Sequence, residues 1–409
     1  MNPRIYLLAL GTFTVGTEGY VIAGVLPSVA HDMHTSVSLC GQLVTVFALV
    51  YALAGPPLIG LFHQVEPRRL LTGAALFFAA ANALAALAPD YAVLVAARVL
   101  AALGAALFAA PAAATAAALC APDELPRAIS VTAGGNAVAL TLGAPIGTVI
   151  GSALGWRASF WFVTLLAVAT AVAVRTGLPA VPAGGNPAAG RLNLLHRTPI
   201  RWGLATTFGL FLAAYCVYTY LDPVAHRAAG FGSTGVAALM IVFGAGGLLA
   251  GRAVSGLIAR HGLARVLRGA LTLIAGLLTV LAALTATRTP LLATAVAFPL
   301  MFTFGAAWWS GGISQQTRLA GLAPAQRAQA LGLHFSAQAL GLHFSAQFLG
   351  VAVGGGLGGL ALSGVGPAAV PVVGAAVALL TVLSIRRVTP EPVPAPGSER
   401  EPAAAETSG

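Results

Sequence analysis

Twelve apolar runs, each close to the length of a helix that crosses a bilayer, decide what this chain can fold into. A bilayer core requires about 20 consecutive apolar residues in a helix. Because an unpaired backbone amide is costly in lipid, we expect these runs to be helices. The sequence therefore predicts an all-α integral membrane protein with twelve transmembrane helices. The runs cover about 5–26, 39–61, 70–87, 91–119, 129–154, 160–174, 202–221, 235–258, 266–284, 291–313, 340–362 and 368–385.

The charge of the chain agrees with a membrane protein and disfavours a nucleic-acid-binding one. Only 8% of the residues are charged, against about 25% in a soluble domain. The arginines that give the net charge of +10 are scattered between apolar runs, so we expect them to face anionic lipids and not nucleic acid. The three cysteines and the loop histidines show no ligand spacing, so we expect no metal and no cofactor.

The distribution of arginine predicts the orientation. The predicted loops and ends on one side of the membrane carry sixteen arginines and those on the other side three, which places both termini in the cytoplasm. All 21 cationic side chains are arginine, as is typical of a GC-rich bacterial genome, so we expect a bacterial cell membrane.

A long connection rich in Pro, Gly and Asn divides the runs six and six. We interpret residues 1–175 as an N-terminal six-helix bundle, 176–201 as a cytoplasmic linker and 202–389 as a C-terminal six-helix bundle. The Pro-rich, charged residues 390–409 are expected to be a disordered tail. Two parallel halves around a central site are typical of transporters.

Small residues recur every four positions in the fifth run. Gly135, Ala139, Gly143, Gly147 and Gly151 would form one stripe on a helix, which allows close approach of another helix in lipid. Pro145 cannot donate a hydrogen bond to the carbonyl of Thr141, so we expect the helix to bend there.

Four ionisable residues lie in or at the edge of the runs: Glu18, Arg98, Asp222 and Arg252. A charge at the bilayer centre costs about 3 kcal/mol. At 1.5 Å per residue, Glu18 lies roughly 12 Å and Arg98 roughly 10 Å below the same face. The two could carry protons, or could form a permanent pair that holds two helices together. Asp222 is either a second coupling acid or a solvated acid at a helix end.

Several polar and aromatic residues are candidates for contact with a transported molecule. Thr14 and Tyr20 flank Glu18, Asn136 lies in the glycine stripe, and Tyr218 belongs to a crowd of tyrosines. Helix–helix hydrogen bonds and interfacial belts are the alternative explanations. We expect Trp308 and Trp309 to be interfacial anchors near the end of the tenth run.

The segment 330–338, ALGLHFSAQ, is repeated letter for letter at 339–347. Nine residues rotate a helix by about two and a half turns, so a continuous helix would present the copies on opposite faces. We expect one copy to lengthen the connection or to overhang the membrane, and assign it no role.

Several segments together resemble the major facilitator superfamily, in particular its twelve-helix drug:proton antiporter branch. They include GTEGYVIAGVLP at 16–27, LVAARVLAAL at 94–103, GGNAVALTLGAPIG at 134–147, GWRASFW at 155–161 and YTYLDPVAHRAAGF at 218–231. The resemblance implies two six-helix bundles, proton coupling at Glu18 and Arg98, and alternating access. It also implies that Gly135, Gly143, Pro145 and Gly147 belong to the antiporter motif of exporters such as chloramphenicol-resistance and arabinose-efflux-like permeases.

One loop departs from the pattern of that family. In GLFHQVEPRR at 60–69, Arg68 and Arg69 match, but Gln64 stands where the family has an acid and Pro67 where it has a glycine. Glu66, two residues off register, is the acid available to replace it. In the second half, Arg260 stands at the acidic position.

We therefore predict a monomeric, proton-coupled antiporter that exports a small amphipathic drug, with chloramphenicol as the best single guess. An exporter of a sugar or an endogenous metabolite with the same fold is the nearest alternative. A polytopic membrane enzyme would require clustered acids, whereas the eleven acids lie mostly in loops and in the tail, so we expect no enzymatic activity. A receptor or scaffold would not need the acid at position 18.

Overall fold

The computed structural model describes residues 2–120, 124–180, 191–320 and 329–385, and the regular elements in these ranges are helices. The elements are α1 (Ile5–Asp32), α2 (Val37–Leu61), α3 (Pro67–Ala86), α4 (Tyr91–Ala118), α5 (Leu125–Val138), the π-helix η1 (Ala139–Gly143), α6 (Ala144–Leu154), α7 (Trp156–Gly177), the 3-10 helix η2 (Arg191–His196), α8 (Thr198–Tyr218), α9 (Leu221–Ala229), α10 (Ser233–His261), α11 (Leu263–Thr287), α12 (Pro290–Ala320), α13 (Gln329–Gly364) and α14 (Ala369–Ile385).

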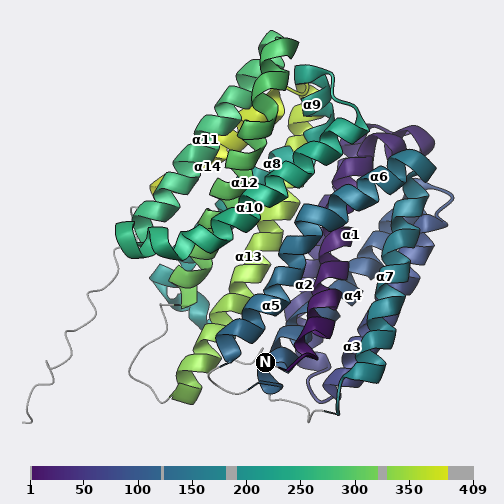
Figure 1. Cartoon of the computed structure of the whole chain (residues 1–409), viewed down its shortest axis with the longest axis vertical. Coiled ribbons are helices and arrows are strands. Elements are labelled where there is room, and N and C mark those ends of the chain that lie inside the picture. The colour runs from purple at the N-terminus through teal and green to yellow at the C-terminus, as the bar shows by residue number, and fades with distance from the viewer. Residues whose placement is uncertain (1, 121–123, 181–190, 321–328, 386–409) are drawn as a thin grey trace, which may run out of the picture.

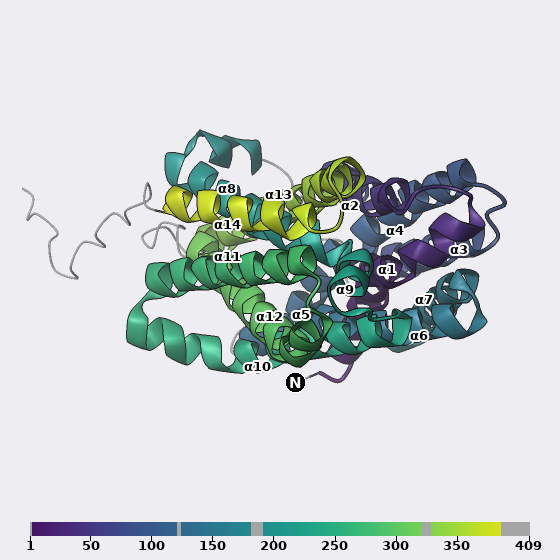
Figure 2. The ribbon, with the colours of Figure 1, turned by 90° about the horizontal axis from the view of Figure 1, so that it is seen from above.

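The structure confirms the predicted fold class of an all-α integral membrane protein. In the described part of the chain, eleven helices are long and apolar enough to cross a membrane, with the end of α5, η1 and α6 forming one of them. The 17-residue helix α14 is the twelfth. Figure 1 shows α1–α7 on one side of the molecule and α8–α14 on the other, and Figure 2 shows the same division from above.

Local chemistry explains two of the differences between the predicted and the observed boundaries. The sixth run begins at Trp156 instead of residue 160, because Gly155 adopts a φ of 88° and lets the chain turn directly from α6 into α7. The seventh run does not reach residue 221, because α8 ends at Tyr218 and the short helix α9 follows. The linker prediction falls partly on 181–190, and the tail prediction falls on 390–409; both lie outside the described residues.

A π-helical turn interrupts the fifth span at the place where a bend is expected. The amide of Ala144 donates to the carbonyl of Ala139, five residues back, immediately before Pro145. A π-turn of this kind contains one more residue than an α-turn, and Pro145 has no amide hydrogen to continue the α-helical ladder. The interruption is therefore built from the residue types that predicted it.

The glycine stripe packs against α1 along its whole length. A Cβ on Gly135 would overlap the carbonyl of Ala9, one on Gly143 would overlap Thr17, and one on Gly147 would overlap Val21. The contacts of this span with the other half come instead from residues such as Thr141, which lies against Gly244 of α10. The span thus joins α1 to the C-terminal half.

The repeat lies in a single helix. Helix α13 is continuous through both copies, and the second copy carries the buried His343, whose Nδ1 lies 3.0 Å from the Thr207 hydroxyl of α8. The side chains of the first copy lie outside the described residues. That one copy overhangs the membrane therefore remains a prediction.

Candidate transport site

The structure brings Glu18 of α1 and Arg98 of α4 together as a buried ion pair. The carboxylate is 0% exposed and the guanidinium 1% exposed. Arg98 also donates through Nε to the carbonyl of Leu43 in α2, at 3.4 Å, and lies 4.5 Å from the centroid of the Phe47 ring. Glu18 and Arg98, which the sequence places at similar depth, therefore meet where three helices are in contact.

The ion pair joins Glu18 Oε1 to Arg98 Nη1. The other two terminal atoms, Glu18 Oε2 and Arg98 Nη2, are buried and form no hydrogen bond with any described residue. A buried carboxylate without a full set of hydrogen bonds is costly while ionised. Protonation at Glu18 Oε2 would remove that cost, but would leave the buried Arg98 without its counter-charge.

Tyr20 follows Glu18 by two residues on α1 and points in a different direction. Two residues correspond to about 200° around a helix, so Glu18 and Tyr20 lie on nearly opposite sides of α1. The Asn136 amide of α5 donates to the Tyr20 hydroxyl at 3.0 Å. Gly16 allows this approach, because a Cβ there would overlap the Asn136 side chain.

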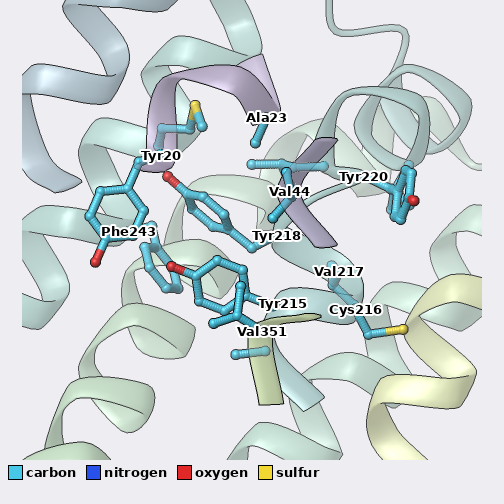
Figure 3. Close-up of a cluster of buried hydrophobic side chains, with 14 of the residues drawn as sticks. Tyr20, Ala23, Val44, Tyr215, Cys216, Val217, Tyr218, Tyr220, Phe243 and Val351 are labelled. Carbon is cyan, nitrogen blue, oxygen red and sulfur yellow. The ribbon is translucent and has the colours of Figure 1, made fainter. Parts of the chain in front are cut away.

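Tyr20 and six rings from the other half form a group that we name the aromatic cluster. The Tyr20 ring packs edge-on against Tyr218 of α8, with centroids 6.2 Å apart. Tyr218 in turn lies 5.4 Å from Phe243 of α10, and Phe243 lies 5.6 Å from Trp308 of α12. Figure 3 shows Tyr20, Tyr215, Tyr218 and Phe243 grouped together, with Tyr220 set apart from them. The members, all buried, are Tyr20, Phe211, Tyr215, Tyr218, Phe243, Phe304 and Trp308.

The expectation that Trp308 is an interfacial anchor is wrong. It is 4% exposed and lies inside the aromatic cluster. The predicted end of the tenth run, residue 313, placed it near the interface, but α12 continues to Ala320. Trp308 therefore lies roughly 18 Å along the helix from that end.

Two other candidates have their described contacts elsewhere. The Thr14 hydroxyl lies 2.9 Å from that of Thr170 in α7, within the N-terminal half. Asp222 lies in the first turn of the short helix α9, at the end of the molecule opposite the N-terminus (Figure 1), which we name the distal end. Burial raises the pKa of the Asp222 carboxyl, and the charge of His226 lowers it by a smaller amount.

Sequence reasoning missed the distal seam, which we define as the contact of Ser38, Gly41 and Thr45 of α2 with α13 and Tyr220. The Ser38 hydroxyl donates to the carbonyl of Gly359 at 2.7 Å, and the Thr45 hydroxyl donates to that of Ala352 at 3.1 Å. The sequence signal for this contact is a second pair of α13 glycines, Gly355 and Gly359. They are four residues apart and therefore share one face of the helix, which lies against α2.

Glu66 pairs with its own neighbours in sequence. Its carboxylate lies 3.3 Å from Arg68 and 3.1 Å from Arg69, at the start of α3. Whether it replaces the missing loop acid remains a prediction.

Comparison with known proteins decides the family. The family model of the Major Facilitator Superfamily matches residues 8–342. The chain belongs to the major facilitator superfamily. This superfamily member is therefore a multi-pass membrane transporter, and the resemblance in its motifs is confirmed at that level.

Individual relatives agree with this assignment. The chain is 30% identical, over 93% of its length and 94% of the relative's, to the uncharacterised MFS-type transporter YbcL of Bacillus subtilis (strain 168). It is 34% identical to a chloramphenicol resistance protein of Streptomyces lividans, over 65% of this chain and 69% of that one. Among solved structures, a D-xylose–proton symporter has a TM-score of 0.77 at 16% identity, covering 95% of this chain and 97% of its own. That likeness shows the shared fold.

Proposed function

We propose that this transporter is a proton-coupled antiporter that exports a small amphipathic aromatic drug, with chloramphenicol as the best single candidate. The observation that carries the proposal is the position of α1, which holds Glu18 against Arg98 on one side and Tyr20 in the aromatic cluster on the other. The similarity to the chloramphenicol resistance protein of Streptomyces lividans supports the choice of drug.

Coupling follows from the cost of an unpaired buried charge. Removing one partner of a buried ion pair destabilises a protein by about 3–5 kcal/mol. Protonated Glu18 would leave Arg98 with the carbonyl of Leu43 and the Phe47 ring as its described partners. The proton therefore favours a different position of α1 relative to α2 and α4, and Tyr20 moves with α1. The transported molecule and the proton thus act on one helix.

The state described here fits one end of an alternating-access cycle. The two halves meet at the distal seam and at Thr148 of α6, whose hydroxyl lies 3.9 Å from the Met240 sulfur of α10. With the N-terminus in the cytoplasm of a bacterial cell, the distal end faces outward. In the proposed cycle this state would be the form closed to the outside, and export would require this seam to open.

Transport into everted membrane vesicles tests the proposal. Wild-type vesicles should accumulate chloramphenicol when a proton gradient is imposed, and a protonophore should abolish the accumulation. Glu18→Gln should abolish it while the protein remains in the membrane, because the amide cannot carry the proton. Asp32→Asn is the matched control: its acid is also paired with an arginine, Arg157, but both side chains are exposed, so uptake should persist. Unchanged gradient-driven uptake by Glu18→Gln would refute the assignment.

A further inference from the structure

Two polar groups in the aromatic cluster are buried without a hydrogen-bond partner. The Nε1 of Trp308 and the hydroxyl of Tyr218 contact no acceptor or donor in the described residues, although the side chains are only 4% and 3% exposed. The Tyr20 hydroxyl, in the same cluster, is satisfied by Asn136. The deficit is therefore confined to groups supplied by α8 and α12.

The surroundings of these groups consist of rings. Trp308 lies 5.2 Å from Phe211 and 5.6 Å from Phe243, and Tyr218 lies 5.7 Å from Tyr215, all between centroids. Buried tyrosine and tryptophan usually find a partner for the O–H or N–H. Leaving such a group unsatisfied costs about 1–3 kcal/mol. A molecule that enters the cluster and accepts from these groups recovers that free energy.

We infer that Trp308 and Tyr218 are specificity-determining residues that donate hydrogen bonds to oxygen acceptors on a neutral aromatic substrate. The indole N–H donates and never accepts, so the group opposite Trp308 must be an acceptor such as a carbonyl, nitro or sulfonyl oxygen. The inference rests on the proposed export function and narrows its substrate class.

The charge of the cluster supports a neutral substrate. None of its seven members carries a formal charge at neutral pH, and the nearby Glu18 is already paired with Arg98. A carboxylate substrate would lack a cationic partner in the cluster, and a cationic substrate would lack an anionic one. The flat rings offer stacking and edge contacts, while two spare donors are too few for a sugar.

Ligand binding by the purified full-length protein tests this inference. Trp308→Phe and Tyr218→Phe keep a ring and remove one donor. Trp161→Phe is the matched control, because it changes an exposed indole on α7 that lies outside the cluster. The probes are chloramphenicol, which is neutral and carries nitro and amide oxygens, and tetraphenylphosphonium, an aromatic cation without such an acceptor.

We expect Trp308→Phe and Tyr218→Phe each to raise the Kd for chloramphenicol about 2- to 13-fold, the effect of one net hydrogen bond, and Trp161→Phe to leave it unchanged. An unchanged Kd in Trp308→Phe and Tyr218→Phe overturns the inference while the proposed function stands. Equal weakening for both probes also overturns it, because that result reports ring packing. Wild-type protein that binds only tetraphenylphosphonium overturns the neutral class, and wild-type protein that binds neither overturns the proposed function itself.

Discussion

Gly41 provides a test of the proposal that the distal seam opens and closes during transport. Tyr220, between α8 and α9, is fully buried, and its hydroxyl donates to the carbonyl of Gly355 at 2.9 Å. The hydroxyl and the ring edge occupy the space where Gly41 of α2 would carry a Cβ. We predict that Gly41→Ala disfavours the state in which the seam is closed.

The magnitude follows from the overlap. Inserting one methyl group into a packed contact costs about 1–3 kcal/mol. The cost applies only while α2 meets α13 and Tyr220, so it is absent from a state in which the seam is open. At 1.36 kcal/mol per factor of ten, the equilibrium should shift roughly 5- to 150-fold toward the open state.

Spin labels at the exposed His34 and Val365 report the shift. These residues follow α1 and α13 in the chain, so they lie beside the two sides of the seam. Electron–electron distance measurements should show a longer-distance population that grows in Gly41→Ala. Gly73→Ala is the matched control, because its Cβ would meet open space in α3, and its distribution should match that of the unsubstituted protein.

A second substitution makes the test specific. Tyr220→Ala opens the space that the new methyl group needs, so adding Gly41→Ala to it should produce little further change, as expected of residues in contact. Simple addition of the two effects, or an unaltered distribution in Gly41→Ala alone, would refute the reasoning.

Two further predictions concern the repeat and α9. Deleting residues 330–338 leaves the second copy preceded by the same Ala-Gln dipeptide, and the contact of His343 with Thr207 is retained, so drug resistance of a host cell should stay near that of the full chain; lost resistance with normal protein levels would give the first copy a function. Because burial raises the pKa of Asp222, the folded protein holds this proton more tightly than the unfolded chain, so its stabilising contribution, present at low pH, is lost as the pH rises through the folded pKa. The midpoint temperature of thermal unfolding in detergent should therefore fall more steeply between about pH 4 and 7 for the wild type than for Asp222→Asn. Parallel curves of midpoint against pH would contradict this.

The sequence predicted the structure best at residues whose behaviour inside a membrane helix is restricted, such as charged residues and proline. Charges buried in apolar runs must find partners, and the similar depth of Glu18 and Arg98 made a pair between them one of two open interpretations; the structure shows that the two are paired. Pro145 after a run of small residues predicted an interruption, although the form it takes, the π-turn at Ala139–Gly143, depends on how many residues the turn contains. Such features depend on the chemistry of neighbouring residues, so they can be predicted from the sequence.

Contacts between the halves could not be predicted in the same way. Tyr220 and Gly355 are far from Gly41 in sequence. Nothing in their spacing indicates that the Tyr220 hydroxyl occupies the space beside Gly41 in the other half of the molecule. Trp308 was misread because the end of an apolar run is a poor measure of where a helix ends. In both cases the decisive information is the packing of α12 and α13 against other helices, which composition and periodicity do not contain.

Helix α1 connects the proposed coupling pair, Glu18 and Arg98, with the aromatic cluster. A transporter that stored its proton on one helix and its substrate on another would need a separate connection between them. Here Glu18 and Tyr20 are two residues apart, and the glycine stripe fits closely along α1, so a displacement of one residue carries the other. If Glu18→Gln altered proton coupling but left the pH dependence of binding to the cluster unchanged, α1 would not be the connection, and the link would have to pass through α2 and the distal seam.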